Sequence, residues 1–230
     1  MEHLITHTFG FAQYLINELK AFVCHILGKS SMKKVAIDCY YYETDCKAVG
    51  IVFDSFEDKT PIDIITKHVK CNEAYVPGQF YKRELPGIMA ILEEVDLSTI
   101  DTIVIDGNVM LRDTNGVKKP GLGMKLYEKI HKDWPKIKVI GVAKKRFGTT
   151  DSIAGIVIRG NSKNPLYVTT SPNADLLRAT SQIQGMHGKY RIPTLLKILD
   201  KETKTEDKLE DVKSKKPETK KRSWRHKQNR

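Results

Sequence analysis

Cysteine is scarce in this sequence and is not arranged for a metal site or a disulfide framework. The four residues are Cys24, Cys39, Cys46 and Cys71, and none forms a CxxC pair. No Cys/His cluster has the spacing of zinc ligands. The pattern is typical of reduced thiols, so we expect a cytoplasmic protein.

The sequence also lacks a signal peptide and an uninterrupted membrane-spanning run. Residues 1–31 have no basic start and no small-residue cleavage site, and Glu18, Lys20 and His25 interrupt their apolar stretch. We therefore expect no membrane partner. Apolar residues recur three or four apart in this segment, which favours an amphipathic helix in an N-terminal appendage that packs on the domain or dimerises.

Acidic residues are too few to balance the basic ones. The chain has 39 Lys and Arg against 28 Asp and Glu, a formal net charge of +11, which favours a polyanionic partner. From Lys213 onward, nine basic residues and one acid supply +8 of this charge. We expect a disordered basic tail over residues 204–230, which is either a solvated charge run or a non-specific contact with phosphates.

The rest of the composition is that of one globular domain. With 230 residues, of which 40% are apolar, the chain can bury one substantial core, and we assign residues 32–203 to it. We expect the protein to be a monomer.

The order of apolar patterns predicts an α/β fold. Short β-rich runs over residues 33–42, 48–56 and 61–69 predict an antiparallel meander. Helical spacing follows over 84–96, with Pro86 and Gly87 expected in the first turn. The later elements are expected as strands over 101–108, 138–145, 153–160 and 166–171 and helices over 121–134, 173–183 and 191–202. We predict a mixed sheet with helices on its faces.

Two acids stand at the ends of apolar strands. Asp38 ends "VAID" and Asp106 ends "IVID", positions from which side chains emerge at the edge of a sheet. Each could be a turn or cap residue. If the strands are neighbours, the two carboxylates repel unless a cation lies between them, and oxygen ligands suit Mg²⁺ or Mn²⁺. Such ions serve phosphodiester nucleases, which fits a basic protein.

Glu84 and Asp200 are further candidates for this site. Glu84 begins the helix after the meander, where a carboxylate could instead simply interact favourably with the helix dipole. Asp200 lies on the last predicted helix, where it could be an ordinary surface acid. Arg83, next to Glu84, could contact a phosphate or pair with a carboxylate.

The ordered motifs resemble the endonuclease V family. A strand ending in Asp is followed by "YVPGQFYKRE", "IVIDG", "VIGVAKK", "PLYVT" and "YRIP", and the similarity extends from Val35 to about Asp200. The resemblance implies a ribonuclease H-like fold and a nuclease that uses Mg²⁺, with Mn²⁺ as a substitute. It also implies recognition of inosine or deoxyinosine and hydrolysis of the second phosphodiester bond 3′ of it, leaving a 5′-phosphate.

The resemblance assigns roles to individual residues. Asp38, Glu84 and Asp106 would bind the metal, and Asp200 would occupy the family's fourth acidic position. Lys144 would contact the scissile phosphate. The residues implied for lesion binding are Tyr75, Val76, Pro77, Gly78 and Gly141. An aromatic and apolar wedge such as Tyr75 can hold open the gap that a flipped base leaves.

Alternatives remain at the level of the substrate. We favour DNA repair over an inosine-specific endoribonuclease, and the third possibility is a non-catalytic nucleic-acid-binding protein. Val109 occupies a family glycine position, and neither His nor Pro precedes Arg112 in "DGNVMLRD". This departure keeps open a nuclease of the same fold without base preference.

Overall fold

The computed structural model describes residues 32–42, 45–70 and 81–205. The strands of the main sheet are β1 Lys33–Tyr42, β2 Asp45–Phe53, β3 Asp63–Lys70, β4 Ile100–Asp106, β7 Lys138–Ala143, β8 Gly155–Val157 and β9 Leu166–Thr170. The α-helices are α2 Tyr81–Leu92, α3 Leu122–Ile130, α4 Leu176–Gly185 and α5 Thr194–Lys204, and short 3₁₀ turns cover η1 Leu97–Thr99 and η2 Thr150–Ile153.

These strands form one mixed, seven-stranded sheet in the order β3-β2-β1-β4-β7-β9-β8. The first three make the predicted antiparallel meander, and β1, β4 and β7 run parallel to one another. β9 pairs antiparallel with β7, and β8 closes that edge. The parallel strands are apolar on both sides because helices cover both faces of the sheet.

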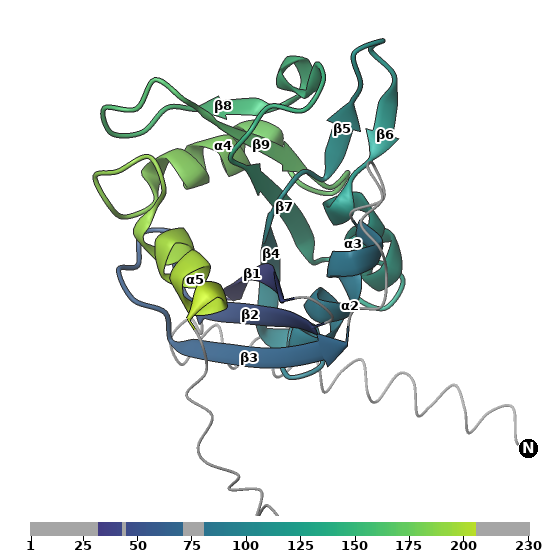
Figure 1. The fold of residues 1–230 in the computed structure, drawn as a ribbon, viewed down its shortest axis with the longest axis vertical. Coiled ribbons are helices and arrows are strands. Elements are labelled where there is room, and N and C mark those ends of the chain that lie inside the picture. Colours follow the sequence, from purple (N-terminus) through teal and green to yellow (C-terminus); the bar gives the residue numbers. More distant parts are fainter. Residues whose placement is uncertain (1–31, 43–44, 71–80, 206–230) are drawn as a thin grey trace, which may run out of the picture.

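Alternate residues of the strands fill two separate cores. On one face, Ile37, Ile105 and Val139 pack with α2 and α3, and on the other, Ala36, Val104 and Val142 pack with α4 and α5. Figure 1 shows α2 and α3 together on one side of β4 and β7, with α4 and α5 on the other side. The predicted α/β domain, with a mixed sheet flanked by helices, is confirmed.

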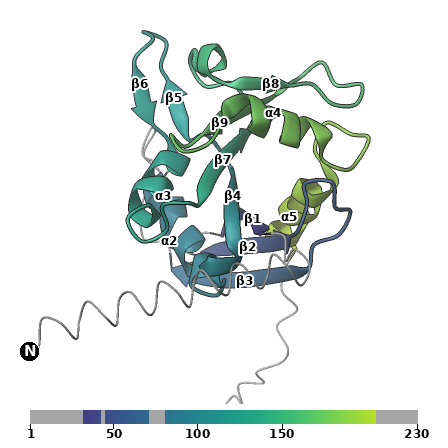
Figure 2. The same cartoon turned by 180° about the vertical axis from the view of Figure 1, so that it is seen from behind.

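Two local expectations were wrong. Helix α2 includes Tyr81, so Pro86 lies beyond its first turn, where proline removes one N–H donor from the helix. Residues 109–120, which the sequence gave only as a loop between the strand over 101–108 and the helix over 121–134, contain a hairpin of β5 Met110–Arg112 and β6 Lys118–Pro120. Figure 2 shows this hairpin standing away from the main sheet, above α3.

The predicted N-terminal appendage lies outside the described residues, as does the tail after Thr205, so both stay predictions. None of the helices that the structure describes is long and apolar enough to cross a membrane.

Candidate functional site

Three aspartates meet at the carboxyl end of the parallel strands. Asp38 and Asp106 follow Ile37 and Ile105, which pair in the register of β1 with β4, so the two acids are neighbours. Asp200 comes from α5, which packs against β1 and β2. One carboxylate oxygen from each aspartate lies within 4.8 Å of the others, close enough for a shared metal ion.

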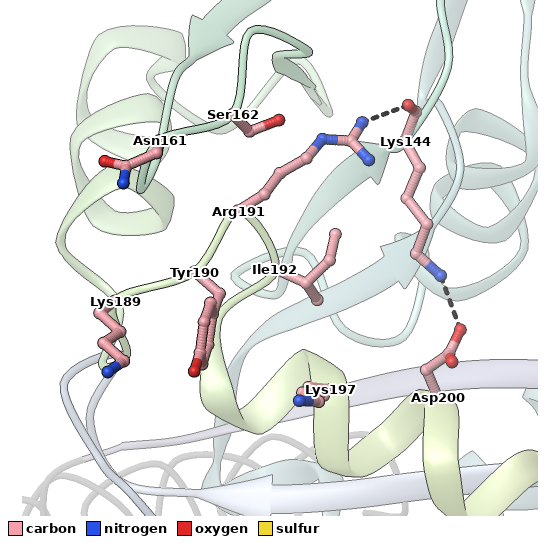
Figure 3. Close-up of a pocket in the computed structure, with 9 residues that line it drawn as sticks. All are labelled: Lys144, Asn161, Ser162, Lys189, Tyr190, Arg191, Ile192, Lys197 and Asp200. Carbon is pink, nitrogen blue, oxygen red and sulfur yellow. Dashed lines mark hydrogen bonds and ion pairs between the residues drawn. The ribbon is translucent and has the colours of Figure 1, made fainter.

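Lys144 joins two of these acids. It follows β7, the parallel neighbour of β4, and its Nζ donates to Asp106 at 2.6 Å and to Asp200 at 2.9 Å. Figure 3 shows the lysine side chain reaching toward Asp200. Asp200 also accepts from Lys204 at 2.7 Å. Asp38, Asp106 and Lys144 therefore do converge on one site. Contrary to the prediction, Asp38 does not end its strand: only the pairing of β1 with β4 ends there, and β1 continues along β2 to Tyr42.

Glu84 approaches this site from α2. Helix α2 packs closely on the sheet at Gly87, where an added Cβ would lie only 3.0 Å from the Sγ of Cys39 and 3.1 Å from that of Cys46. The Glu84 side chain is 5% exposed. Glu84 is not among the acids whose oxygens lie close enough to share one ion, which are Asp38, Asp106 and Asp200. The charges of Asp38 and Asp106 nevertheless act on the Glu84 carboxyl group.

Burial and mutual repulsion separate the proton affinities of the acids. Desolvation, followed by the charge of Asp106, raises the pKa of Asp38 to about 7. Desolvation, with the charges of Asp38 and Asp106, raises the pKa of Glu84 well above its usual range. Burial also disfavours the Asp200 carboxylate, yet hydrogen bonds from Lys204 and Lys144 bring the pKa of Asp200 below its ordinary value.

The donor set suits a hard divalent cation. It consists of carboxylate oxygens, the ligands that Mg²⁺ and Mn²⁺ prefer, without a thiol or imidazole in the cluster that the structure describes. The four carboxyl groups outnumber the two ammonium groups beside them, those of Lys144 and Lys204. Desolvation and then mutual repulsion raise the pKa values of Asp38 and Glu84, and a cation would offset that repulsion. The residues therefore fit such an ion.

Gly141 positions the backbone beside the site. A Cβ there would lie 2.5 Å from the carbonyl oxygen of Gly107 and 2.8 Å from the amide nitrogen of Val109. The loop after Asp106 thus rests directly on β7, and the Val109 amide donates to Thr169 Oγ1 at 2.8 Å. Gly141 itself is buried, and its predicted contact with nucleic acid stays a prediction.

Two arginines near the site have structural partners. The Arg83 guanidinium lies 4.2 Å from the centre of the Tyr41 ring, a cation–π contact beside Glu84. Arg191, for which the sequence predicted no role, donates to the carbonyl oxygens of Lys144, Asn164 and Pro165. It fixes the backbone of Lys144, and the "YRIP" motif was the available signal for it.

The lesion-binding residues Tyr75, Val76, Pro77 and Gly78 lie outside the described residues. Their roles stay predictions.

The sequence of the chain is similar to those of known proteins. The Endonuclease V family matches residues 25–201 of the chain. Endonuclease V of Nostoc punctiforme is 28% identical over 166 residues, which make up 64% of this chain and 70% of the relative.

Solved structures show the same fold. Human ENDOV has a TM-score of 0.59 at 16% identity, over 76% of this chain and 84% of that one. Endonuclease V of Ciona intestinalis, in complex with a 23mer DNA containing an inosine followed by a ribo-adenosine, has a TM-score of 0.60 at 17% identity over the same shares. The likeness confirms the ribonuclease H-like fold.

Proposed function

The chain belongs to the endonuclease V family of nucleases, which hydrolyse phosphodiester bonds of nucleic acid, and from this we propose a specific reaction. The protein recognises inosine or deoxyinosine and cleaves the second phosphodiester bond 3′ of it, in DNA repair. The observation that carries the proposal is the convergence of Asp38, Asp106 and Asp200 beside Lys144 at the end of the parallel strands.

In this proposal, Asp38, Asp106 and Glu84 bind a Mg²⁺ ion, for which Mn²⁺ can substitute. Asp200 is the fourth acid of the site. A bound divalent cation would activate water and neutralise charge on the phosphate. Lys144 offers its ammonium to a phosphate oxygen, where charge grows in the transition state. Arg191 keeps that lysine in place through the Lys144 carbonyl.

Recognition of the lesion is assigned to the segment before α2. Tyr75, Val76 and Pro77 would fill the gap left by the flipped base, and Gly78 would line its pocket. Gly141 would act through the loop after Asp106, which it supports. Glu84, on the helix that this segment enters, connects the predicted lesion reader with the acids.

RNA is the second candidate substrate. The Ciona intestinalis relative was crystallised with a strand in which inosine is followed by a ribo-adenosine, which makes a ribonucleotide at this place relevant. We favour DNA and test both. We further propose that the protein acts as a monomer in the cytoplasm, where Cys39 and Cys46 would stay free thiols.

Matched DNA and RNA oligonucleotides with adenine or inosine at one position test the reaction. With Mg²⁺, the wild type should cut the inosine strands at the second 3′ phosphodiester and leave the adenine strands intact. Asp38→Ala and EDTA should each abolish cutting. Equal cutting of adenine and inosine would contradict the lesion specificity, and cutting in EDTA would contradict the metal mechanism.

A further inference from the structure

Two adjoining hollows lie beside the acidic site. The first, of about 970 Å³, reaches from Lys144 and Asp200 to the loops that carry Asn161 and Tyr190. The second, of about 650 Å³, continues along α5 as far as Thr205. Both are lined by Tyr190, Ile192, Lys197 and Asp200, so the two hollows adjoin, and Asp200 belongs to the candidate metal centre. We call the two hollows together the trough.

Six of the fourteen residues that line the trough are basic, and they far outnumber its acids. Its basic residues are Lys144, Lys189, Arg191, Lys197, Lys201 and Lys204, whereas Asp200 is the one acid among the residues that line the two hollows. The three lysines of α5 recur at intervals of four and three residues, which places them along one side of the helix. A groove of this charge attracts a phosphate backbone.

Tyr190 stands where the two hollows join. Its side chain is 60% exposed, and the Nζ atoms of Lys189 and Lys197 lie 5.5 and 5.4 Å from its ring centre. Figure 3 shows the ring between the two lysines. Contacts of exposed lysines with an aromatic ring are weak, and stacking of a nucleobase on such a ring is stronger. A base can therefore displace a lysine, whose ammonium then remains beside the phosphates.

The loop that presents Tyr190 is firmly held. Arg159, 5% exposed, donates to the carbonyl oxygens of Met186 and Gly188 at 2.7 Å each. The Thr194 amide donates to the His187 carbonyl at 2.8 Å. On the far side of Tyr190, Arg191 is bonded to three carbonyl groups.

An aromatic ring that is exposed on a braced loop gains little from its own packing. It is arranged in advance for an external partner. Since the ring lies between cations and next to a nuclease site, a nucleobase fits it better than an apolar peptide side chain.

We propose that the trough binds a single-stranded stretch of the substrate next to the cleavage site, with one unpaired base stacked on Tyr190. Either a DNA or an RNA strand would fit, because both offer bases that can stack on the ring and phosphates that can pair with Lys189, Lys197 and Lys201. This inference rests on the proposed nuclease function but not on its selectivity for inosine.

The first experiment measures stacking directly. Single-stranded DNA and RNA oligonucleotides carry one inosine, and 2-aminopurine replaces each flanking base in turn. In EDTA, binding of the wild type should quench the fluorescence strongly at one position. Tyr190→Phe should keep that quenching, and Tyr190→Ala should lose it and bind about tenfold more weakly. Quenching that Tyr190→Ala leaves unchanged at every position would overturn the proposal.

The second experiment tests the coupling between ring and base. An abasic nucleotide at the quenched position should weaken binding of the wild type about as much as Tyr190→Ala does, and combining the two should add little. Independent, additive losses would contradict stacking. Lys197→Ala should make the slope of log K against log salt shallower by about 0.7. The control is Lys132→Ala, an exposed lysine just after α3 on the other face of the sheet, which should leave the slope unchanged.

These outcomes are separable from the proposed function. If the wild type cut adenine and inosine strands alike, the lesion specificity would fail while the quenching and coupling still decided the role of Tyr190. If cutting depended on inosine but Tyr190→Ala bound the strand as the wild type does, only the proposal that the trough binds the strand would be overturned. Quenching confined to the DNA or to the RNA series would identify which strand the trough holds.

Discussion

At the scale of single residues, the acids differ in how much solvent and positive charge each has. Glu84, in the first turn of α2, is 5% exposed, and its pKa is raised well above the usual range, whereas Asp200 is paired with Lys144 and Lys204. Burial and mutual repulsion raise the pKa values of Asp38 and Glu84, and a bound cation would relieve that repulsion.

Glu84→Gln should separate function from stability. The amide keeps the shape but removes the repelled charge, so we expect Tm at pH 8 in EDTA to rise by about 2–4 °C, the shift for about 1 kcal/mol in a domain of this size. Cleavage of an inosine strand should fall at least about a hundredfold. Full activity together with raised stability would contradict a catalytic role of Glu84 and leave only its position in the first turn of α2.

The stability of the metal-free protein should depend on pH through Asp38. Its pKa is about 7 in the folded protein and about 3.9 when unfolded, so the folded state holds the proton more tightly. The stabilisation is complete below about pH 4 and is lost as the pH rises through 7. Thermal unfolding in EDTA should show this decline. Asp38→Asn should make it smaller and leave the part that the raised pKa of Glu84 causes.

Asp200 does not mask that decline. The pKa of Asp200 is lowered on folding, so this residue stabilises the folded state fully above its unfolded pKa. That stabilisation is lost only as the pH falls below the unfolded pKa and through the folded one. Mn²⁺ must displace the Asp38 proton, so its stabilising effect should grow from pH 6 to pH 8. A Mn²⁺ effect independent of pH would contradict Asp38 as a ligand.

At the scale of elements, strand patterns predicted much of the site. Asp38 and Asp106 could be placed together because apolar runs that end in an acid are typical of buried parallel strands, whose carboxyl ends share one edge. Asp200 and Lys144 needed the resemblance, because no local pattern says which face of a helix meets which strand. The β5–β6 hairpin was missed although Asn115-Gly116 is a turn signal.

Other parts of the site depend on contacts distant in the sequence. Arg191 meets the carbonyl of Lys144, 47 residues away, and no periodicity encodes such a bond. Likewise, the trough joins α5 to loops that follow β7 and β8. Tyr190 looked like part of a motif in the sequence, and its exposure became known only with the packed structure.

Gly141→Ala should disturb the contact between β7 and the loop after Asp106. The added Cβ meets backbone atoms, the Gly107 oxygen at 2.5 Å and the Val109 nitrogen at 2.8 Å, which cannot rotate away. We expect a loss of about 1–3 kcal/mol in the free energy of unfolding, measured by urea denaturation, and reduced cleavage. Gly185→Ala in α4 is the control, since its Cβ would meet nothing within 4 Å.

If Gly141→Ala is as stable as Gly185→Ala, the close approach of the loop to β7 is wrong. If it is destabilised but cuts normally, the loop packs there without positioning Asp106.

At the scale of the whole molecule, positive charge occurs in two places that should do different work. One is the trough along α5, whose lysines lie next to the acids. The other is the sequence from Lys213 onward, which carries +8 of the net +11. The first can align a strand with the site, whereas the second can raise affinity for any polyanion without aligning it.

Truncation after Val212 tests this division. It lowers the formal net charge from +11 to +3, so binding to DNA without inosine should weaken by at least about tenfold at low salt, with a shallower dependence on salt. Cleavage of an inosine strand at saturating concentration should stay within about twofold of the full chain, because no residue of the acidic site or the trough is removed. The measurements are salt-titrated binding by fluorescence anisotropy and single-turnover cleavage. Loss of cleavage at saturation would show that the tail takes part in the reaction. Unchanged non-specific binding would show that the folded domain alone supplies the electrostatic part of the affinity for DNA.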